Sequence, residues 1–352
     1  MTGAEGARAP DRRPRSAPTV KDIAKAADVS PMTVSRVLSG GKNVRPQVRE
    51  HVERVIAEVG YHRNENARRL RQGERSGLIG VLITNIGNPY YAGMLQGVEQ
   101  VVAATGRRVM VGLTNEDADL EKQLVLDFLG RQVEGLIVVP VGQDPVRFAP
   151  ERLGGVPLVL ASRSFDGSLA DAVLLDDVRG AFEATRRMLE EGHRRIAYLG
   201  NRVSVATGRR RLEGFESAHR ELGFEPAPDL VRLGQQDADS AERAMDDLLD
   251  LADPPTAVFA ANNRNSVGVI RSMNRHRAEA RRAGVELPTL RLFGFDSFEF
   301  ADMSPIPLSI VDHDPSELGR IAAKLLFDRL EGESQGAPAR LVELPVRLVD
   351  FS

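Results

Sequence analysis

The chain carries TVKDIAKAADVSPMTVSRVL at residues 19–38, and this stretch fixes the architecture of its front part. The apolar spacing within 21–27 predicts one short helix, with Thr19 placed to cap its start. Residues 28–30 break that period, and Pro31 then opens a second helix where proline is best tolerated. Two short helices joined by such a turn are typical of a helix-turn-helix that reads the major groove of DNA. A pair of packed helices in an ordinary α domain is the alternative interpretation.

The second predicted helix has an apolar side and a polar side. The polar side carries Met32, Thr33, Ser35 and Arg36. Hydroxyl side chains reach phosphates, and a guanidinium reaches either a phosphate or a guanine edge. This face therefore predicts contact with double-stranded DNA.

A third helix is predicted from residue 46 to residue 59, because its valines keep helical spacing and close a three-helix core. The next segment, YHRNENARRLRQG at 61–73, is cationic and too polar to bury. Asn64 is placed to cap a brief helix in which Leu70 has no apolar partner at helical spacing. Leu70 is either an ordinary linker residue or a wedge for a minor-groove base step, with the arginines on phosphates.

The charge is divided unequally along the 352 residues. Up to residue 75 there are 16 Lys and Arg against 9 Asp and Glu, and the remainder has 31 against 41. The front is therefore cationic and the rest anionic. This division suits a small module that holds a polyanion and a larger body that stays off it.

The composition argues against several kinds of site. There is no Cys, and the six His are scattered without the spacing of a metal site. Residues 1–18 lack the apolar core of a signal peptide, and no apolar run approaches the length of a membrane span. We therefore expect a cytoplasmic protein with a disordered basic arm over 1–18, no metal, no cofactor and no membrane partner.

The sequence offers no enzymatic motif. It has no GxGxxG after a strand, no Walker loop and no GxSxG nucleophile elbow. We therefore expect no catalytic residues. An exported carbohydrate-binding protein is a second alternative, but the missing signal peptide and the DNA module argue against it.

Beyond residue 75, short apolar runs alternate with amphipathic helices such as 91–104 and 120–129. This alternation is typical of βαβ units, and it occurs twice. We therefore expect an α/β body of two doubly wound parallel sheets, with a ligand crevice between the lobes at the carboxyl ends of the strands. The predicted buried strands are 78–83, 108–113, 135–139, 157–161, 172–175, 196–199, 230–233, 257–260 and 290–295.

A cationic helix-turn-helix, a hinge with one leucine and a two-lobed α/β body together resemble the LacI/GalR family of bacterial transcriptional regulators. The resemblance covers residue 19 onward, and it is most specific in the quoted stretch and in NENARRL at 64–70. It implies a helix-turn-helix domain over 19–62, a hinge helix and linker over 63–75, and an effector-binding and dimerisation domain over 76–352. The last of these is expected to look like a periplasmic sugar-binding protein.

The same resemblance implies which residues contact DNA. Pro31, Met32 and Arg36 fall at positions that read the operator, and Leu70 falls at the minor-groove lever of the hinge. The remaining positions hold the backbone or the hinge helix, and they are Thr19, Ser30, Thr33, Ser35, Ser39, Asn43, Asn64, Ala67 and Arg68.

The resemblance also implies an effector site whose polar groups suit a polyol. Its expected residues are Tyr90, Tyr91, Arg163, Thr207, Arg211, Gln236, Asn262 and Asp296. Two alternatives stay open for these residues. The tyrosines could pack between the lobes, and Arg211 could simply pair with Asp296 across the cleft.

Three positions of the expected effector pocket depart from the pattern of the family. Gln236 stands where a ring often stacks on the ligand, Asn263 replaces an aspartate, and Ser162 replaces an acidic residue before Arg163. A pocket with fewer carboxylates and one fewer ring suits a phosphorylated or acidic sugar, or a modified oligosaccharide. A degenerate pocket in a constitutive DNA-binding regulator is the alternative.

The resemblance implies a homodimer, and together with the residues it predicts a repressor of carbohydrate uptake or catabolism genes. Its partners are operator DNA and a small-molecule effector, most simply a sugar or sugar derivative, which shifts a two-state equilibrium of the dimer. The sequence leaves open whether the effector is an inducer or a corepressor.

Overall fold

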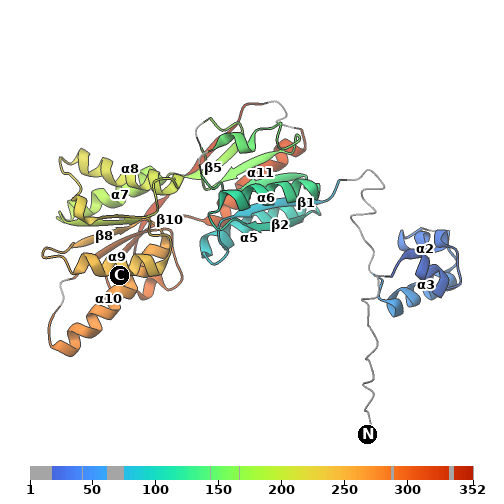
Figure 1. Ribbon diagram of the computed structural model, residues 1–352, viewed down its shortest axis with the longest axis horizontal. Helices are drawn as coiled ribbons and strands as arrows, with labels where there is room; N and C mark the ends of the chain where they lie inside the picture. Colours follow the sequence, from blue (N-terminus) through green and yellow to red (C-terminus); the bar gives the residue numbers. More distant parts are fainter. Residues whose placement is uncertain are drawn as a thin grey trace, which may run out of the picture. The chain divides into compact units, whose positions relative to one another are not determined.

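The computed structural model describes residues 18–41, 43–61, 75–142, 144–165, 167–286, 289–332 and 337–351. The chain divides into two compact units, Met1–Glu74 and Arg75–Ser352, which we call the front unit and the main unit (Figure 1). The predicted hinge residues Asn64, Ala67, Arg68 and Leu70 lie outside the described residues, as does nearly all of the predicted arm. The statements about them therefore stay predictions.

The front unit contains three helices, α1 (Val20–Ala26), α2 (Pro31–Leu38) and α3 (Pro46–Val59). Thr19 caps α1 in a reciprocal arrangement, because its hydroxyl accepts from the backbone N–H of Asp22 while its own N–H donates to the Asp22 carboxylate. Helix α3 ends at Gly60, whose φ of 67° is a left-handed conformation that glycine adopts without steric cost. The three helices close on a small apolar core formed by Ile23, Ala24, Ala27, Val34, Val37, Val52 and Val55.

The main unit contains two six-stranded sheets, one in each lobe. The first lobe has the strand order β11-β5-β4-β3-β1-β2, and the second has the order β12-β10-β9-β8-β6-β7. The first sheet consists of β1 (Leu78–Ile83), β2 (Arg108–Leu113), β3 (Gly135–Val138), β4 (Leu158–Ala161), β5 (Asp171–Leu175) and β11 (Leu341–Leu344). The second consists of β6 (Ile196–Gly200), β7 (Val231–Leu233), β8 (Ala257–Ala260), β9 (Arg291–Phe295), β10 (Leu308–Asp312) and β12 (Arg347–Phe351).

Helices cover both faces of each sheet, which buries the strands on both sides. In the first lobe, α5 (Pro89–Ala104) and α11 (Pro315–Leu330) cover one face, and α6 (Ala118–Gly130) covers the other. In the second lobe, α7 (Asp177–Glu190) and α8 (Ala206–Glu221) lie opposite α9 (Ala238–Leu249) and α10 (Asn263–Ala283). Short 3-10 turns complete the described elements at η1 (Pro145–Phe148), η2 (Pro228–Leu230) and η3 (Ala301–Met303).

Helices α5 and α11 approach each other closely through two glycines. A Cβ atom at Gly97 would clash with the backbone of Ser316, and one at Gly319 would clash with the backbone of Met94. Only a hydrogen atom fits at either position, so this packing fixes α5 relative to the strand ends beneath it.

The chain passes between the two lobes at Asp176, at residues 313–314 and at residues 345–346. In each lobe the strand order reverses beside the first strand, β1 or β6, and the carboxyl ends of the strands meet the other lobe. Such a reversal leaves a crevice at the strand ends, where ligands bind in doubly wound folds. None of the described helices is long and apolar enough to span a membrane.

The structure confirms the predicted α/β fold class and each of the predicted strands to within a few residues. The sequence interpretation omitted β10, β11 and β12, and the pairing of β12 with β10 is antiparallel rather than parallel. The last two are edge strands whose side chains are partly exposed, so they lack the continuous apolar run of a buried strand. The basic stretch at 275–283 ends the long helix α10, where Arg275 pairs with Glu242 and Asp246 of α9.

Candidate functional site

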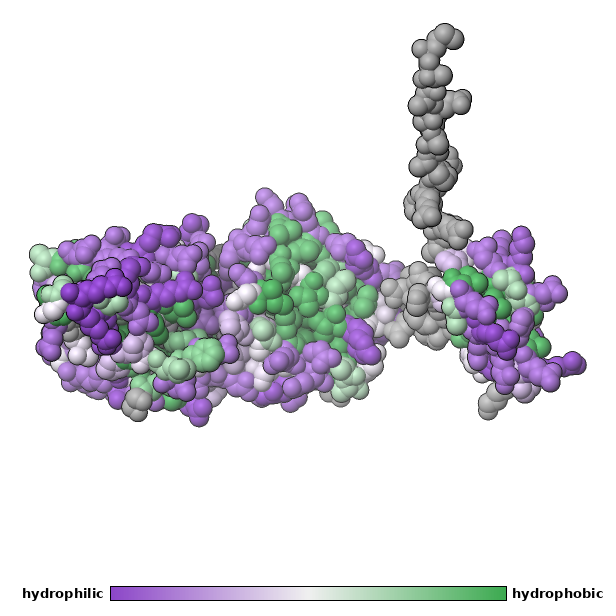
Figure 2. Space-filling model, turned by 90° about the horizontal axis from the view of Figure 1, so that it is seen from below, coloured by the Kyte–Doolittle hydropathy of each residue, from purple (hydrophilic) through white to green (hydrophobic). Residues whose placement is uncertain are grey.

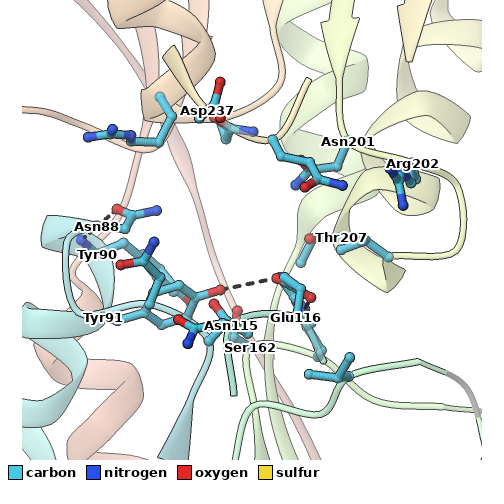
Figure 3. Close-up of a pocket in the computed structure, with 18 of the residues that line it drawn as sticks. Asn88, Tyr90, Tyr91, Asn115, Glu116, Ser162, Asn201, Arg202, Thr207 and Asp237 are labelled. Atoms are coloured by element: carbon cyan, nitrogen blue, oxygen red, sulfur yellow. Dashed lines mark hydrogen bonds and ion pairs between the residues drawn. The ribbon is translucent and has the colours of Figure 1, made fainter. Parts of the chain in front are cut away.

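A cavity of about 610 Å³ lies between the lobes of the main unit. Figure 3 shows its residues on two facing walls, with Tyr90, Tyr91 and Ser162 on one side and Asn201, Arg202 and Asp237 on the other. The first lobe contributes Thr84, Asn85, Asn88, Tyr90, Tyr91, Asn115, Glu116, Val141, Gly142, Ser162 and Arg163. The second contributes Asn201, Arg202, Ser204, Val205, Thr207, Arg211, Gln236, Asp237, Asn262, Arg264 and Asp296.

The structure brings all of the predicted effector residues to this one cavity. They come from both lobes, and apart from Arg211, in the second turn of α8, they lie after strands or in the first turns of helices. That they contact an effector stays a prediction. The residues are Tyr90, Tyr91, Arg163, Thr207, Arg211, Gln236, Asn262 and Asp296.

Arg211, on α8, is the central charge of the second wall. Its guanidinium donates to Asp296 at 3.0 Å and 3.3 Å, to Asp177 at 2.8 Å and to the carbonyl of Ala261 at 2.7 Å. The pair with Asp296 therefore forms, but within the second lobe and not across the cleft. Burial raises the pKa of Asp177 even though Arg211 acts against it. These contacts hold the guanidinium rigidly at the cavity wall.

Asp296 connects this wall to the chain that crosses between the lobes. One of its carboxylate oxygens lies 2.9 Å from Nε2 of His313, which follows β10. Burial alone would raise the pKa of Asp296, but Arg211 and His313 outweigh burial and the pKa is lowered, so the carboxylate is charged. The His313 ring also packs edge-on against the Tyr90 ring, with the centroids 5.5 Å apart. A contact chain thus runs from Arg211 to the first lobe.

Arg163 is the corresponding charge of the first wall. Its guanidinium makes a two-point contact with Glu116, at 2.9 Å and 2.7 Å, and donates to the Tyr91 hydroxyl at 3.3 Å. Sequence reasoning missed Glu116 and inferred that Ser162 leaves the pocket short of a carboxylate. The inference is wrong for this wall, because Glu116 comes from the end of β2 and supplies the negative charge.

Several cavity residues have a left-handed backbone conformation. Asn115, Glu116, Ser162 and Asp296 have φ values of 49°, 61°, 65° and 64°. Such a conformation costs a residue other than glycine on the order of 1 kcal/mol or more, and it persists where the surroundings hold it in place. All four residues line the cavity and follow strand ends, which is where functional strain gathers.

A direct hydrogen bond joins the two lobes beside the cavity. The amide nitrogen of Asn263, in the first turn of α10, donates to the side-chain oxygen of Asn88 at 2.8 Å. The same oxygen accepts from the backbone N–H of Tyr90 and so caps α5. The first turn of α10 is therefore tied to the first turn of α5.

The site contains polar residues that sequence reasoning did not select. Asn201 and Arg202 directly follow β6, and Asn115 and Glu116 follow β2 after one intervening residue. Because carboxyl ends of parallel strands gather at one edge, the positions after each predicted strand were the available signal. Arg264 and Asp237 lie in the first turn and at the N-cap of helices that follow strand ends.

In the front unit, the predicted DNA-reading residues lie on the outer face of α2. Met32 is 65% exposed, and Ser35 and Arg36 are exposed as well. Among the residues that the structure describes, the Arg36 guanidinium has no hydrogen-bond or ion-pair partner. These side chains are therefore available for a partner, as DNA reading requires.

Several of the predicted backbone-positioning residues already serve the helices. The Ser30 hydroxyl accepts from the N–H of Thr33 at 3.1 Å and caps α2, and the Ser39 hydroxyl donates to the carbonyl of Ser35 at 2.7 Å. Pro31 begins α2, and Asn43 is exposed ahead of α3. The contact of these residues with DNA stays a prediction. The hydroxyls of Ser30 and Ser39 already stabilise the ends of α2.

Comparison with known proteins matches both units. Residues 19–64 match the family described as bacterial regulatory proteins, lacI family, and residues 185–350 match the periplasmic binding protein-like domain. The HTH-type transcriptional regulator CelR of Thermobifida fusca is 32% identical over 338 residues, 93% of this chain and 96% of that protein. The HTH-type transcriptional repressor CytR of Escherichia coli strain K12 is 28% identical over 334 residues, 94% of this chain and 95% of that protein.

A solved structure shows the same likeness. The transcriptional regulator CelR-cellobiose complex is 29% identical, covers 95% of this chain and 99% of its own, and superposes with a TM-score of 0.68. The helix-turn-helix, the cavity between the two lobes and the relative at 32% identity all point to the same family. This chain belongs to the lacI family of bacterial regulatory proteins, and it is a DNA-binding transcriptional regulator rather than an enzyme.

Proposed function

We propose that this protein represses genes of carbohydrate uptake or breakdown, and that a sugar or sugar derivative in the cavity switches its affinity for operator DNA. The observation that carries the proposal is the cavity of about 610 Å³ between two lobes of a chain that also carries an exposed helix-turn-helix face. Pockets that take small molecules have volumes of this order.

The chemistry of the cavity supports a polyhydroxylated ligand. Asparagine amides, serine and threonine hydroxyls and fixed charges alternate along its walls, and each offers donors or acceptors to sugar hydroxyls. The rings of Tyr90 and Tyr91 provide apolar surface on the first wall. The cellobiose complex of CelR supports the same class of ligand for this chain.

The proposed switch acts on the angle between the lobes. A ligand that touches both walls favours one angle, and it shifts the equilibrium only by the difference in its affinity for the two states. Through the contacts that join Arg211, Asp296, His313 and Tyr90, a ligand on the cavity wall can affect the position of the chain where it crosses between the lobes. A difference of a few kcal/mol between the states is enough to change operator occupancy.

A homodimer is part of the proposal, because an operator with two half-sites is bound by two helix-turn-helix domains. Figure 2 shows an apolar patch on the first lobe of the main unit. The edge strand β2 contributes to the exposed apolar surface of this lobe, since Val111 is 43% exposed and Val109, Met110 and Leu113 are only partly buried. An uncovered apolar edge strand promotes pairing with another chain.

The experiment begins with selection of bound duplexes by the purified full-length chain from a random pool. We expect a near-palindromic consensus. A thermal-shift screen of neutral and acidic sugars then identifies ligands, and gel shifts with the selected duplex measure whether each hit changes operator affinity. No enriched duplex, with or without sugars, would contradict the assignment of a specific operator.

The variant Asp296→Asn separates sugar control from DNA binding. Asparagine tolerates the left-handed backbone at this position, but it lacks the charge that holds Arg211 and His313. We expect operator binding to persist and the sugar response to be lost. A constitutive regulator with a degenerate pocket would instead show no sugar response in the unaltered chain.

A further inference from the structure

The arginines of the cavity are not equally neutralised. Arg163 is paired with Glu116, and Arg211 is paired with Asp296 and Asp177. Arg202 and Arg264 also line the cavity, yet among the described residues neither side chain has a hydrogen-bond or ion-pair partner. Both belong to the second lobe, so the unpaired positive charge lies on one wall only.

These two arginines come from neighbouring strand ends. Strands β6 and β8 pair in parallel with Leu199 opposite Ala260, and Arg202 follows β6 while Arg264 lies in the first turn of α10 after β8. Figure 3 shows Arg202 beside Asn201 on the wall that faces the tyrosines. Both arginines therefore line the cavity from positions that follow neighbouring strands of the same sheet.

Two carboxylates also line this wall, and Asp296 is already paired with Arg211. The other, Asp237, accepts from the N–H of Ser240 at 2.7 Å as the cap of α9, and this bond is the main reason that its pKa is lowered. Its charge is thus engaged at a helix N-terminus, with Arg243 and Arg264 acting on it more weakly. The lining of this wall thus carries three arginines against two carboxylates, and Arg202 and Arg264 are the two arginines that have no hydrogen-bond or ion-pair partner among the described residues.

Helix N-termini add to that positive potential. Helices α8, α9 and α10 all begin at the cavity, and their N-cap residues Val205, Asp237 and Asn262 line it. The N-cap of α8, Val205, provides no side-chain acceptor for the first turn. A helix N-terminus carries partial positive charge and attracts anions, so it acts in the same direction as the arginines.

We propose that the effector is an acidic sugar, and that Arg202 and Arg264 bind its carboxylate or phosphate on the second wall while the neutral first wall binds its hydroxyl groups. The proposal rests on sugar control of operator binding as proposed above. It makes Arg202 and Arg264 determinants of specificity, because an unpaired guanidinium gains most from an ionised oxygen.

Isothermal titration calorimetry on the full-length chain tests the proposal with matched sugars. The first set is glucose, glucuronate and glucose 6-phosphate, and the second is cellobiose and cellobionate. We expect at least one acidic member to bind about tenfold more tightly than its neutral counterpart, with the carboxylate and phosphate probes separating the two anions. Raising the ionic strength should weaken only the acidic member.

Single variants then locate the anion. Arg202→Gln and Arg264→Gln should each weaken the acidic sugar about tenfold and the neutral sugar by no more than about twofold. Arg209→Gln is the matched control, because it removes the same charge from α8 at a residue outside the cavity lining. It should change neither affinity.

The outcomes distinguish the two proposals. If neutral sugars bind as well as or better than their acidic counterparts and release or strengthen operator binding, the anion site is wrong and sugar control stands. Unchanged selectivity in both arginine variants also overturns the anion site. If neither set binds while the operator is still recognised, the proposed sugar effector fails and the anion site fails with it.

Discussion

Arg36 in the front unit and Arg211 in the main unit carry the same guanidinium in opposite surroundings. Arg36 is exposed and has no partner among the described residues, whereas Arg211 is 5% exposed and bound by two carboxylates and a carbonyl. The contrast extends to the whole of each unit. No polar side chain is buried within the described part of the front unit, while the main unit buries several charged ones.

The difference teaches how each unit prepares for its partner. The described part of the front unit folds on an apolar core, and its DNA-reading side chains are exposed. These side chains can therefore be substituted at little cost in stability. The main unit fixes charges in a low-dielectric wall before the ligand arrives, so its site and its stability are coupled. Substitutions that remove the same kind of group should therefore break different properties in the two units.

The largest effect is expected from Arg211→Ala. The change leaves Asp177 and Asp296 buried without their cation, and breaking a buried ion pair from one side costs about 3 to 5 kcal/mol. Urea unfolding followed by circular dichroism measures the loss in the free energy of unfolding. Arg209→Ala, on the same helix, should stay within about 0.5 kcal/mol of the unaltered chain. Equal losses in the two variants would remove the distinction between paired and unpaired arginines.

The second effect concerns pH and Glu121 on α6. Its carboxylate accepts from the N–H of Val141, a cavity residue, at 2.7 Å and pairs with Arg147 at 3.0 Å. Burial raises the pKa of Glu121 from 4.5 to about 7. Because the folded state holds the proton more tightly, the contribution of this group to stability is full below about pH 4.5 and is lost as the pH rises through about 7.

The contribution of Glu121 to the pH dependence is on the order of 3 kcal/mol. Glu121→Gln keeps an oxygen for Val141 but no longer titrates, so the fall in unfolding free energy between about pH 5 and pH 8 should become smaller. Urea unfolding at several pH values measures this slope. A slope that does not change would show that another group carries the pH dependence of the main unit.

A smaller effect on a different property is expected from Arg36→Ala. Operator affinity should fall by about 1 to 3 kcal/mol and base preference should relax, because the exposed guanidinium is predicted to read a base. The free energy of unfolding should change by less than about 0.5 kcal/mol. Duplex selection with the variant checks the first expectation and urea unfolding the second. Unaltered base preference would exclude Arg36 from the reading face.

The smallest effect is expected from Thr19→Ala. Loss of the α1 cap should lower stability of the front unit by about 1 kcal/mol, measured by hydrogen exchange of the α1 amides. Thr19→Ser keeps the hydroxyl and should retain most of the protection. If Thr19 also touches a phosphate, operator affinity falls evenly across sequences in the alanine variant. Unchanged exchange in Thr19→Ala would contradict the capping role.

Local signals in the sequence were sufficient for the three described helices of the front unit and for most of the repeated strand pattern. The capping of α1 by Thr19 and the start of α2 at Pro31 follow from residues close together in the chain. The edge strands β11 and β12 were missed because their partly exposed residues give no continuous apolar run.

Long-range pairing explains what the sequence missed in the cavity. The strand-end rule and the family resemblance brought out residues such as Arg211 and Asp296, but they did not give the partners of each charge. Glu116 pairs with Arg163 across 47 positions, and Asn263 reaches Asn88 across 175. No local pattern encodes such a partner, because it is fixed only when both strands have joined the sheet.

The crossing of the chain at residues 313–314 predicts a distinct phenotype for variants altered there. His313 lies on that crossing and touches both Asp296 and the Tyr90 ring, although it does not line the cavity. We expect substitutions at His313 to leave effector binding and operator binding intact while effector binding no longer changes operator affinity. In a reporter strain such variants would no longer respond to the effector although the purified protein still binds it. This distinguishes them from variants that no longer bind the effector.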